Sequence, residues 1–229
     1  MKNMSTMKKT FWELPLVMTL LLASSCLKEV NNTIALPEIG TAANVIPEEI
    51  RDEFESQMNI YEGTNPPDIT SSFVLSDFVL LYSSDGISSG GIYADQFMKF
   101  YNKIGNTYEY KGTQGGGEEY SPSVVVVGSG SKFTAYYVST NNHYDGESWS
   151  EEANLISGII TDRGITDVTY AFIILDKYDP KGTIMEVNEY RIFDDRDGVA
   201  EFVNWDTTKS ISAESDSSKQ ISKLSKSHK

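Results

Sequence analysis

Two pairs of adjacent acids are the first candidates for chemistry in this chain of 229 residues: Glu118-Glu119 and Glu151-Glu152. A glycoside hydrolase needs two carboxyl groups that face each other across a cleft, roughly 5–9 Å apart. Neighbouring side chains of a strand point to opposite faces of its sheet, so neither adjacent pair forms such a site by itself. The sequence therefore identifies no catalytic residue.

A nucleophile activated by histidine is the second chemistry to consider. His143 and His228 are the two histidines, and a catalytic triad needs one of them beside a Ser or Cys with an acid behind it. No Gly-x-Ser-x-Gly motif occurs, and the single cysteine belongs to a motif described below. The glycines at 115–117 lack the Gly-Lys-Ser/Thr ending of a phosphate-binding loop. We predict no cofactor and no enzymatic activity.

The segment 194–198, Asp-Asp-Arg-Asp-Gly, resembles part of a calcium-binding loop. An EF-hand loop has an acid at its first position, Gly at its sixth and Glu at its twelfth. With Gly198 in the sixth position, the first is Phe193 and the twelfth is Asn204, so both ends fail. We interpret this segment as an acidic turn and predict no metal site.

Aromatic residues are concentrated in the middle of the chain, where residues 93–149 hold 12 of the 26. Packing of a core explains most of them. The pairs Phe100-Tyr101 and Tyr136-Tyr137 place one ring on each face of a strand, so some rings would line a cavity or form a recognition surface. The candidate ligand-binding residues are Tyr101, Tyr136, Tyr137 and Trp149.

The first 25 residues are typical of an export signal. Three lysines precede the apolar run 14–23, which as a helix spans about 15 Å, half of a bilayer core. Such a run is too short to cross a membrane and fits a signal peptide. Ala23-Ser24-Ser25-Cys26 resembles the lipobox of bacterial lipoproteins. This resemblance implies cleavage before Cys26 and its acylation, for example with palmitate. An ordinary secretory signal is the alternative.

Composition divides the rest of the chain into three parts. Residues 26–45 are a polar tether, residues 46–206 a folded domain, and residues 207–229 a Ser/Lys-rich tail that we predict to be disordered. Together, the tether and the domain (residues 26–206) have 11 Lys and Arg against 30 Asp and Glu. Because nucleic-acid binding needs a basic face, this charge excludes the simplest nucleic-acid partner.

The domain begins with one amphipathic helix at 47–61, whose apolar stripe is Ile46, Ile50, Phe54 and Met58. Turn-forming residues separate eight candidate strands rich in β-branched and aromatic residues. With no helical pattern between them, they are expected to be antiparallel. We predict an all-β, up-and-down barrel of about eight strands, with a β-sandwich as the alternative. The candidate strands are 73–82, 96–103, 107–113, 123–128, 132–139, 153–161, 168–177 and 184–193.

Several segments resemble lipoproteins of the Bacteroidetes. They include Ile-Pro-Glu-Glu-Ile at 46–50, Ile-Tyr-Glu-Gly at 60–63 and Asn-Pro-Pro-Asp-Ile at 65–69. Later segments at 155–158, 170–172 and 191–198 are similar too. The resemblance covers most of residues 46–206. It implies an outer-membrane or surface lipoprotein with a lipocalin-like (calycin-type) β-barrel, and it supplies no catalytic residues.

These features together predict a lipid-anchored protein of the cell envelope that binds a small ligand or glycan without catalysing a reaction. Acyl chains on Cys26 would attach it to the outer membrane, on either the surface or the periplasmic face. A structural subunit that docks on an outer-membrane protein is the alternative, and an envelope hydrolase ranks third. A cavity with polar groups favours the first, a filled barrel the second, and two converging carboxylates the third.

Overall fold

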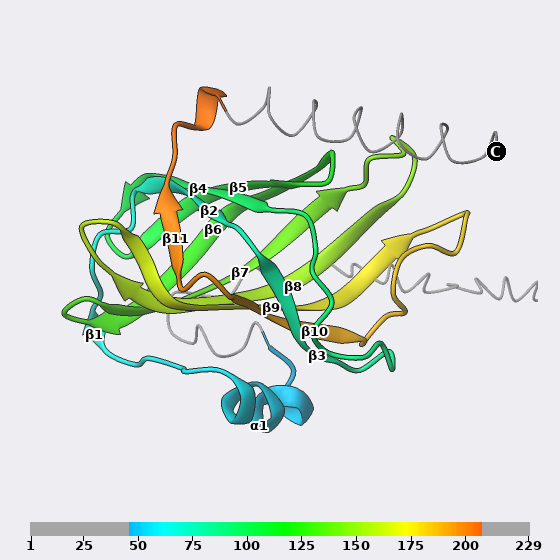
Figure 1. Ribbon diagram of the computed structural model, residues 1–229, viewed down its shortest axis with the longest axis horizontal. Helices are drawn as coiled ribbons and strands as arrows, with labels where there is room; N and C mark the ends of the chain where they lie inside the picture. Colours follow the sequence, from blue (N-terminus) through cyan, green and yellow to red (C-terminus); the bar gives the residue numbers. More distant parts are fainter. Residues whose placement is uncertain (1–45, 208–229) are drawn as a thin grey trace, which may run out of the picture. The chain divides into compact units, whose positions relative to one another are not determined.

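The computed structural model describes residues 46–207, which form one curved sheet and a helix packed outside it (Figure 1). Within these residues, no helix has the length and apolar character needed to cross a bilayer. Cys26 and the predicted signal, tether and tail lie outside the described part. The elements are α1 (Glu48–Gln57), β1 (Thr64–Asn65), β2 (Ser71–Leu75), β3 (Phe78–Ser83), β4 (Gln96–Ile104), β5 (Thr107–Gln114), β6 (Gly117–Ser129), β7 (Lys132–Asn142), β8 (Trp149–Ile160), β9 (Gly164–Tyr178), β10 (Tyr190–Asp195) and β11 (Val199–Phe202).

Eight strands close into a ring. Their order is β11-β2-β4-β5-β6-β7-β8-β9, and the ring closes because β11 pairs with both β2 and β9. All neighbours in the ring are antiparallel, and each strand from β4 to β9 pairs with the next one along the chain. The predicted all-β, antiparallel fold is confirmed. A single sheet joins all the strands, which corresponds to the barrel-like arrangement.

The ring is closed at one end and flanked by a branch at the other. Residues 164–166 of β9 pair with β11, whereas residues 169–173 pair with β10, which in turn pairs with β3. Instead of joining β4, β3 bonds to residues 90–93 of the loop that follows it. This second end of the barrel is therefore bordered by loops.

The strand bounds differ from the predicted ones in ways that matter for the site. The predicted strand 73–82 is two strands, because Asp77 has a positive φ of 48° and ends the run after Leu75. Residues 184–189 precede β10 as a loop, and β11 was not predicted. Strands β6 and β8 begin before their predicted starts at 123 and 153, so they include Glu119 and Glu152.

Apolar side chains form two clusters on opposite faces of the sheet. One fills part of the barrel interior and includes Phe73, Phe100 and Phe133, each 0% exposed. The other lies outside the barrel, where Phe54 of α1 packs near Leu155 and Ile173. The predicted helical stripe is confirmed, since Ile46, Phe54 and Met58 are buried and Ile50 packs against them. Consequently strands β8 and β9 are covered on both faces.

Candidate functional site

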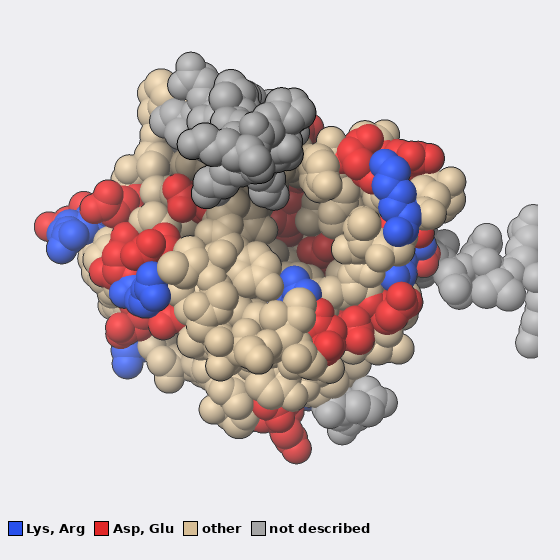
Figure 2. All heavy atoms as spheres, turned by 45° about the vertical axis from the view of Figure 1, so that its right-hand side comes forward, with Lys and Arg blue, Asp and Glu red and all other residues tan. Residues whose placement is uncertain are grey.

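A cavity of about 440 Å³ opens at the loop-bordered end of the barrel. Figure 2 shows this end as a hollow with acidic atoms inside it. Its walls come from strands β3 to β10, and its mouth comes from the loops that contain Asp85, Tyr144 and Met185. The volume lies within the range of pockets that hold small molecules.

The closed end of the barrel is filled by aromatic rings. Phe100 contacts Phe73 with ring centroids 6.3 Å apart and Tyr110 at 5.3 Å. Tyr110 in turn packs on Tyr137 at 4.6 Å. The interior thus changes from packed rings to open space within one barrel, and Tyr110 stands at the boundary.

A belt of hydrogen bonds crosses this boundary on six consecutive strands. On one side, Gln96 Nε2 donates to Tyr110 Oη (3.3 Å), and Tyr110 Oη donates to Glu119 Oε2 (2.8 Å). On the other side, Tyr170 Oη donates to Asn154 Oδ1 (2.8 Å), and Asn154 Nδ2 donates to Ser139 Oγ (2.8 Å). Ser139 Oγ then donates to Glu119 Oε1 (2.7 Å). Both arms of this polar belt therefore end on the carboxyl group of Glu119.

Gly112 of β5 leaves the space that the belt occupies. A Cβ atom at this position would lie 2.5 Å from Tyr110 Oη, 2.8 Å from Glu119 Oε2 and 2.9 Å from Gln96 Nε2. All three are closer than real Cβ contacts allow, so a larger residue would displace the buried polar groups. The polar belt therefore requires glycine at position 112.

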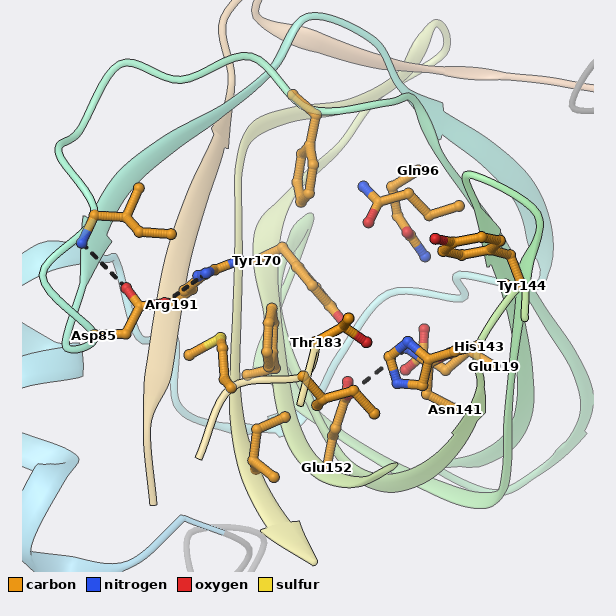
Figure 3. Close-up of a pocket in the computed structure, with 18 of the residues that line it drawn as sticks. Asp85, Gln96, Glu119, Asn141, His143, Tyr144, Glu152, Tyr170, Thr183 and Arg191 are labelled. Atoms are coloured by element: carbon orange, nitrogen blue, oxygen red, sulfur yellow. Dashed lines mark hydrogen bonds and ion pairs between the residues drawn. The ribbon is translucent and has the colours of Figure 1, made fainter. Parts of the chain in front are cut away.

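A second group of polar side chains surrounds Glu152 (Figure 3). Glu152 Oε1 accepts hydrogen bonds from Ser150 Oγ (2.6 Å) and Asn141 Nδ2 (3.5 Å). His143 Nε2 lies 3.0 Å from Ser150 Oγ. Because Ser150 gives its only hydroxyl proton to Glu152, His143 Nε2 is the donor in that contact. Glu152 Oε2 accepts no hydrogen bond from the described residues and borders the cavity.

Burial dominates the electrostatics of the two carboxyl groups. Glu119 is 6% exposed, and burial, followed by the nearby charge of Glu152, raises its pKa to about 8. Burial also raises the pKa of Glu152, which is 4% exposed, while its bonds from Ser150 and Asn141 oppose the rise. Burial lowers the pKa of His143, so its imidazole is uncharged at neutral pH. Each group is thus held in a state that a change of pH or a charged ligand would alter.

The part of the cavity wall away from Glu119 is apolar and carries an ion pair at its rim. Phe172, Ile174 and Met185 line this part, and Ile174 lies beside Glu152 because the two are paired in the β8–β9 register. Arg191 Nη2 pairs with Asp85 Oδ2 at 2.5 Å, on the side of the cavity opposite Glu119 (Figure 3). The cavity therefore has one acidic polar wall and one apolar wall.

The four aromatic residues proposed from the sequence do not line this cavity. Tyr137 is buried below it against Tyr110, and Tyr136 lies on the outer face in the cluster under α1. Tyr101 faces outward beside Lys111, whose Nζ is 4.8 Å from the ring centroid. Trp149 is half-buried at the start of β8. Any binding by Tyr101, Tyr136 or Trp149 would need a different surface.

The acid pairs divide between the two faces of the sheet, as strand geometry requires. Glu119 and Glu152 face the interior, whereas Glu118 is exposed and Glu151 is half-buried. Sequence reasoning missed the inward pair because the strand starts were placed too late. A signal was present in the alternation Ser150, Glu152, Asn154, three polar residues at a spacing of two.

The acidic segment 194–198 comprises the last two residues of β10 and the turn that leads to β11. Gly198 has φ 85° and its amide donates to Asp195 O (3.0 Å), while Asp197 Oδ2 accepts from Ser76 Oγ (2.7 Å). Asp195 is 3% exposed, and burial raises its pKa to about 8. Over residues 46–207, no three His, Cys, Asp or Glu side chains are arranged to hold a metal ion.

Comparison with known proteins identifies no relative: no protein-family model, curated protein or solved structure matches this chain. The function must therefore be argued from the geometry of the site.

Proposed function

We propose that this protein is a lipid-anchored lipoprotein of the cell envelope that binds a small ligand in the open end of its β-barrel, without catalysing a reaction. The observation that carries the proposal is the cavity of about 440 Å³, which is lined by both polar and apolar side chains. Such a division fixes the orientation of a ligand while apolar contact supplies affinity. The barrel is a rigid frame because its ring of hydrogen-bonded strands is closed.

The anchor is proposed from the sequence around Cys26. Small residues precede this cysteine and follow an apolar run of signal-peptide length. Two or more acyl chains hold a protein on a bilayer far more firmly than one, since each buried methylene contributes about 0.8 kcal/mol. The anchor would place the barrel at the outer membrane, attached to its surface or periplasmic face.

A hydrolase is the second candidate, because two carboxyl groups border one cavity. Acid–base catalysis by a carboxyl pair needs environments that push the two pKa values apart, so that one group is protonated and the other ionised. Here burial raises the pKa values of both Glu119 and Glu152. Ligand binding needs no such separation of the two pKa values. The alternative role as an accessory subunit would leave the cavity without a function.

Native mass spectrometry of the mature protein, gently extracted from its source cells, tests ligand binding. We expect a reproducible adduct of small-molecule size that disappears on unfolding. A matched control is Gly112→Leu, whose side chain would enter the polar belt and reduce the adduct. A bare mass in repeated preparations, with a folded protein by circular dichroism, would overturn the binding proposal.

Metabolic labelling with palmitate tests the anchor independently. We expect the wild type and Ser24→Ala to incorporate label and to fractionate with membranes, and Cys26→Ala to do neither. Labelling of Cys26→Ala would contradict acylation at this residue.

A further inference from the structure

We infer that the cavity binds a small organic cation, whose protonated amine lies against Glu119 and Glu152 and whose apolar body lies against the wall formed by Phe172, Ile174 and Met185. This inference rests on the proposed ligand-binding function and names the chemical class of the ligand.

The polar wall has hydrogen-bond acceptors left over. The amide nitrogens of Gln96 and Asn141 donate to Tyr110 and Glu152, which leaves their carbonyl oxygens without hydrogen bonds from the described residues. Glu152 Oε2 is likewise unpartnered, although its side chain is 96% buried and points into the cavity (Figure 3). All three residues line the cavity, so these acceptors are available to a ligand that brings several N–H groups.

The charges of the lining residues lead to the same class of ligand. Three acids, Asp85, Glu119 and Glu152, line the cavity, and Arg191 is the one Lys or Arg among the described lining residues. Arg191 already pairs with Asp85 at the rim. The two glutamates therefore have no cationic partner among the lining residues. A buried carboxylate is destabilising unless a positive charge compensates it, and a bound ammonium ion would do so.

The direction of the polar belt favours a cation over a neutral hydroxylated ligand. Tyr110 and Ser139 both donate to Glu119, so the belt positions that group as an acceptor through both oxygens. The raised pKa of Glu119 means that this group is largely protonated at neutral pH without a ligand. A bound cation favours the ionised form, whose two oxygens accept from both donors, whereas a sugar hydroxyl leaves the carboxyl group protonated.

The apolar wall and the volume of the cavity suit an apolar body of modest size for the rest of the ligand. Phe172 stacks on Phe193 with ring centroids 6.0 Å apart, which holds its ring in place beside the cavity. Ile174 and Met185 extend this surface toward the mouth. An amine on an aromatic or alicyclic body satisfies both walls at once, because its charged end and its apolar end are separated.

A matched panel of ligands tests the class by isothermal titration calorimetry. The probes are phenethylamine, 2-phenylethanol and 3-phenylpropionate, with the same three head groups on indole and cyclohexyl bodies. The protein is the full chain in a non-ionic detergent at neutral pH. We expect at least one amine to bind about tenfold or more tightly than the alcohol of the same body, and the carboxylates to bind most weakly.

Two pairs of variants assign the binding to the glutamates. Glu152→Gln and Glu119→Gln should each weaken binding of the amine by about tenfold or more and leave the alcohol nearly unchanged. Glu151→Gln and Glu118→Gln are the matched controls, since they remove the same charge from the opposite face of the same strands. Circular dichroism checks that every variant is folded, and either inward variant alone is sufficient for the test.

The outcomes separate this inference from the proposed function. An alcohol or carboxylate that binds as tightly as its amine, or amine binding that both inward variants leave unchanged, would overturn the cationic ligand while ligand binding stands. Binding by none of the nine probes would also overturn it. The co-purified adduct then decides the proposed function separately, and an adduct without a basic nitrogen would support binding but not this ligand class.

Discussion

The two ends of the barrel interior are built from the same strands but hold different side chains. At the closed end, rings such as Phe73, Phe100 and Phe133 are completely buried and fill the space. At the open end, Glu119 and Glu152 are nearly as buried, yet they border a cavity of about 440 Å³. The closed end gains stability from packing, whereas the open end holds buried polar groups that folding does not require. This difference supports the proposed binding of a ligand at the open end.

A change in strand parity helps to produce this difference. In β6, Glu119 and Ser121 face the interior at one end, and Val124 and Val126 face it at the other. Ser121 and Val124 are three positions apart, an odd spacing that a regular strand would place on opposite faces. The register with β7 shifts between Tyr120 and Val124. The irregularity lets one strand present polar residues to the cavity and valines to the core.

The largest expected effect is at the closed end. Phe100→Ala should lower the free energy of unfolding by about 3–5 kcal/mol, since it leaves a void among packed rings. Phe172→Ala at the open end should cost about 1–2 kcal/mol, because that ring already borders space. Urea denaturation measures both. Equal losses would mean that the two ends are packed alike.

The second prediction concerns the pH dependence of stability. Glu119 has a pKa of about 8 in the folded protein, above the ordinary value of 4.5 expected in the unfolded chain. Between these two pKa values the folded state holds a proton that the unfolded state has lost. The contribution of Glu119 to the free energy of unfolding is therefore fully present below about pH 4.5. It falls as the pH rises toward 8, by at most about 1.4 kcal/mol per pH unit.

Glu119→Gln removes that dependence. Relative to the wild type, the variant should gain about 2–4 kcal/mol between about pH 5 and pH 8, measured by urea denaturation at each pH. Glu118→Gln is the control for charge on the same strand. Parallel curves for the wild type and Glu119→Gln would contradict a raised pKa at this site.

A smaller effect is expected from the belt itself. Tyr170→Phe removes the donor to Asn154 Oδ1 and should cost about 1–2 kcal/mol, because the amide oxygen stays buried without that partner. Tyr136→Phe makes the same chemical change on the outer face and should stay within about 0.5 kcal/mol. Thermal unfolding followed by circular dichroism compares them. A neutral Tyr170→Phe would show that the belt adds little to stability.

The smallest effect is expected from the outward acid. Glu118→Gln should change the free energy of unfolding by no more than about 0.5 kcal/mol, as is usual for exposed positions. Chemical denaturation at neutral pH is sufficient to measure it. A loss comparable with that at Tyr170 would show that the face of the strand does not decide the effect.

The sequence was a good guide to the elements and a poor one to the site. Turn residues and β-branched runs located most strands, and the spacing of Ile46, Phe54 and Met58 located the helix. The four aromatic candidates do not line this cavity, and their residue type gave no sign of this because rings of that size fill a core as readily as they border a cavity. The inward glutamates were missed because adjacent acids give no sign of which one faces inward.

Strand β8 shows why the interior could not be derived from the pattern alone. Ala153 and Leu155 alternate with the polar residues Glu152 and Asn154, so alternation by itself points the apolar pair toward the core. In the structure this pair faces outward and α1 covers it, while the polar pair faces inward. Local pattern and tertiary position disagree because the helix supplies a second core.

The sequence by itself determined the antiparallel all-β class, the amphipathic helix and the acidic character of the domain. These properties follow from residue type and short-range spacing, which act within a few residues of each other. Only the tertiary structure decided which face of each strand turns inward, where the interior is filled and which carboxyl groups meet. Those outcomes depend on the closure of the ring, on shifts of register and on the packing of α1, all of which join residues far apart in the chain.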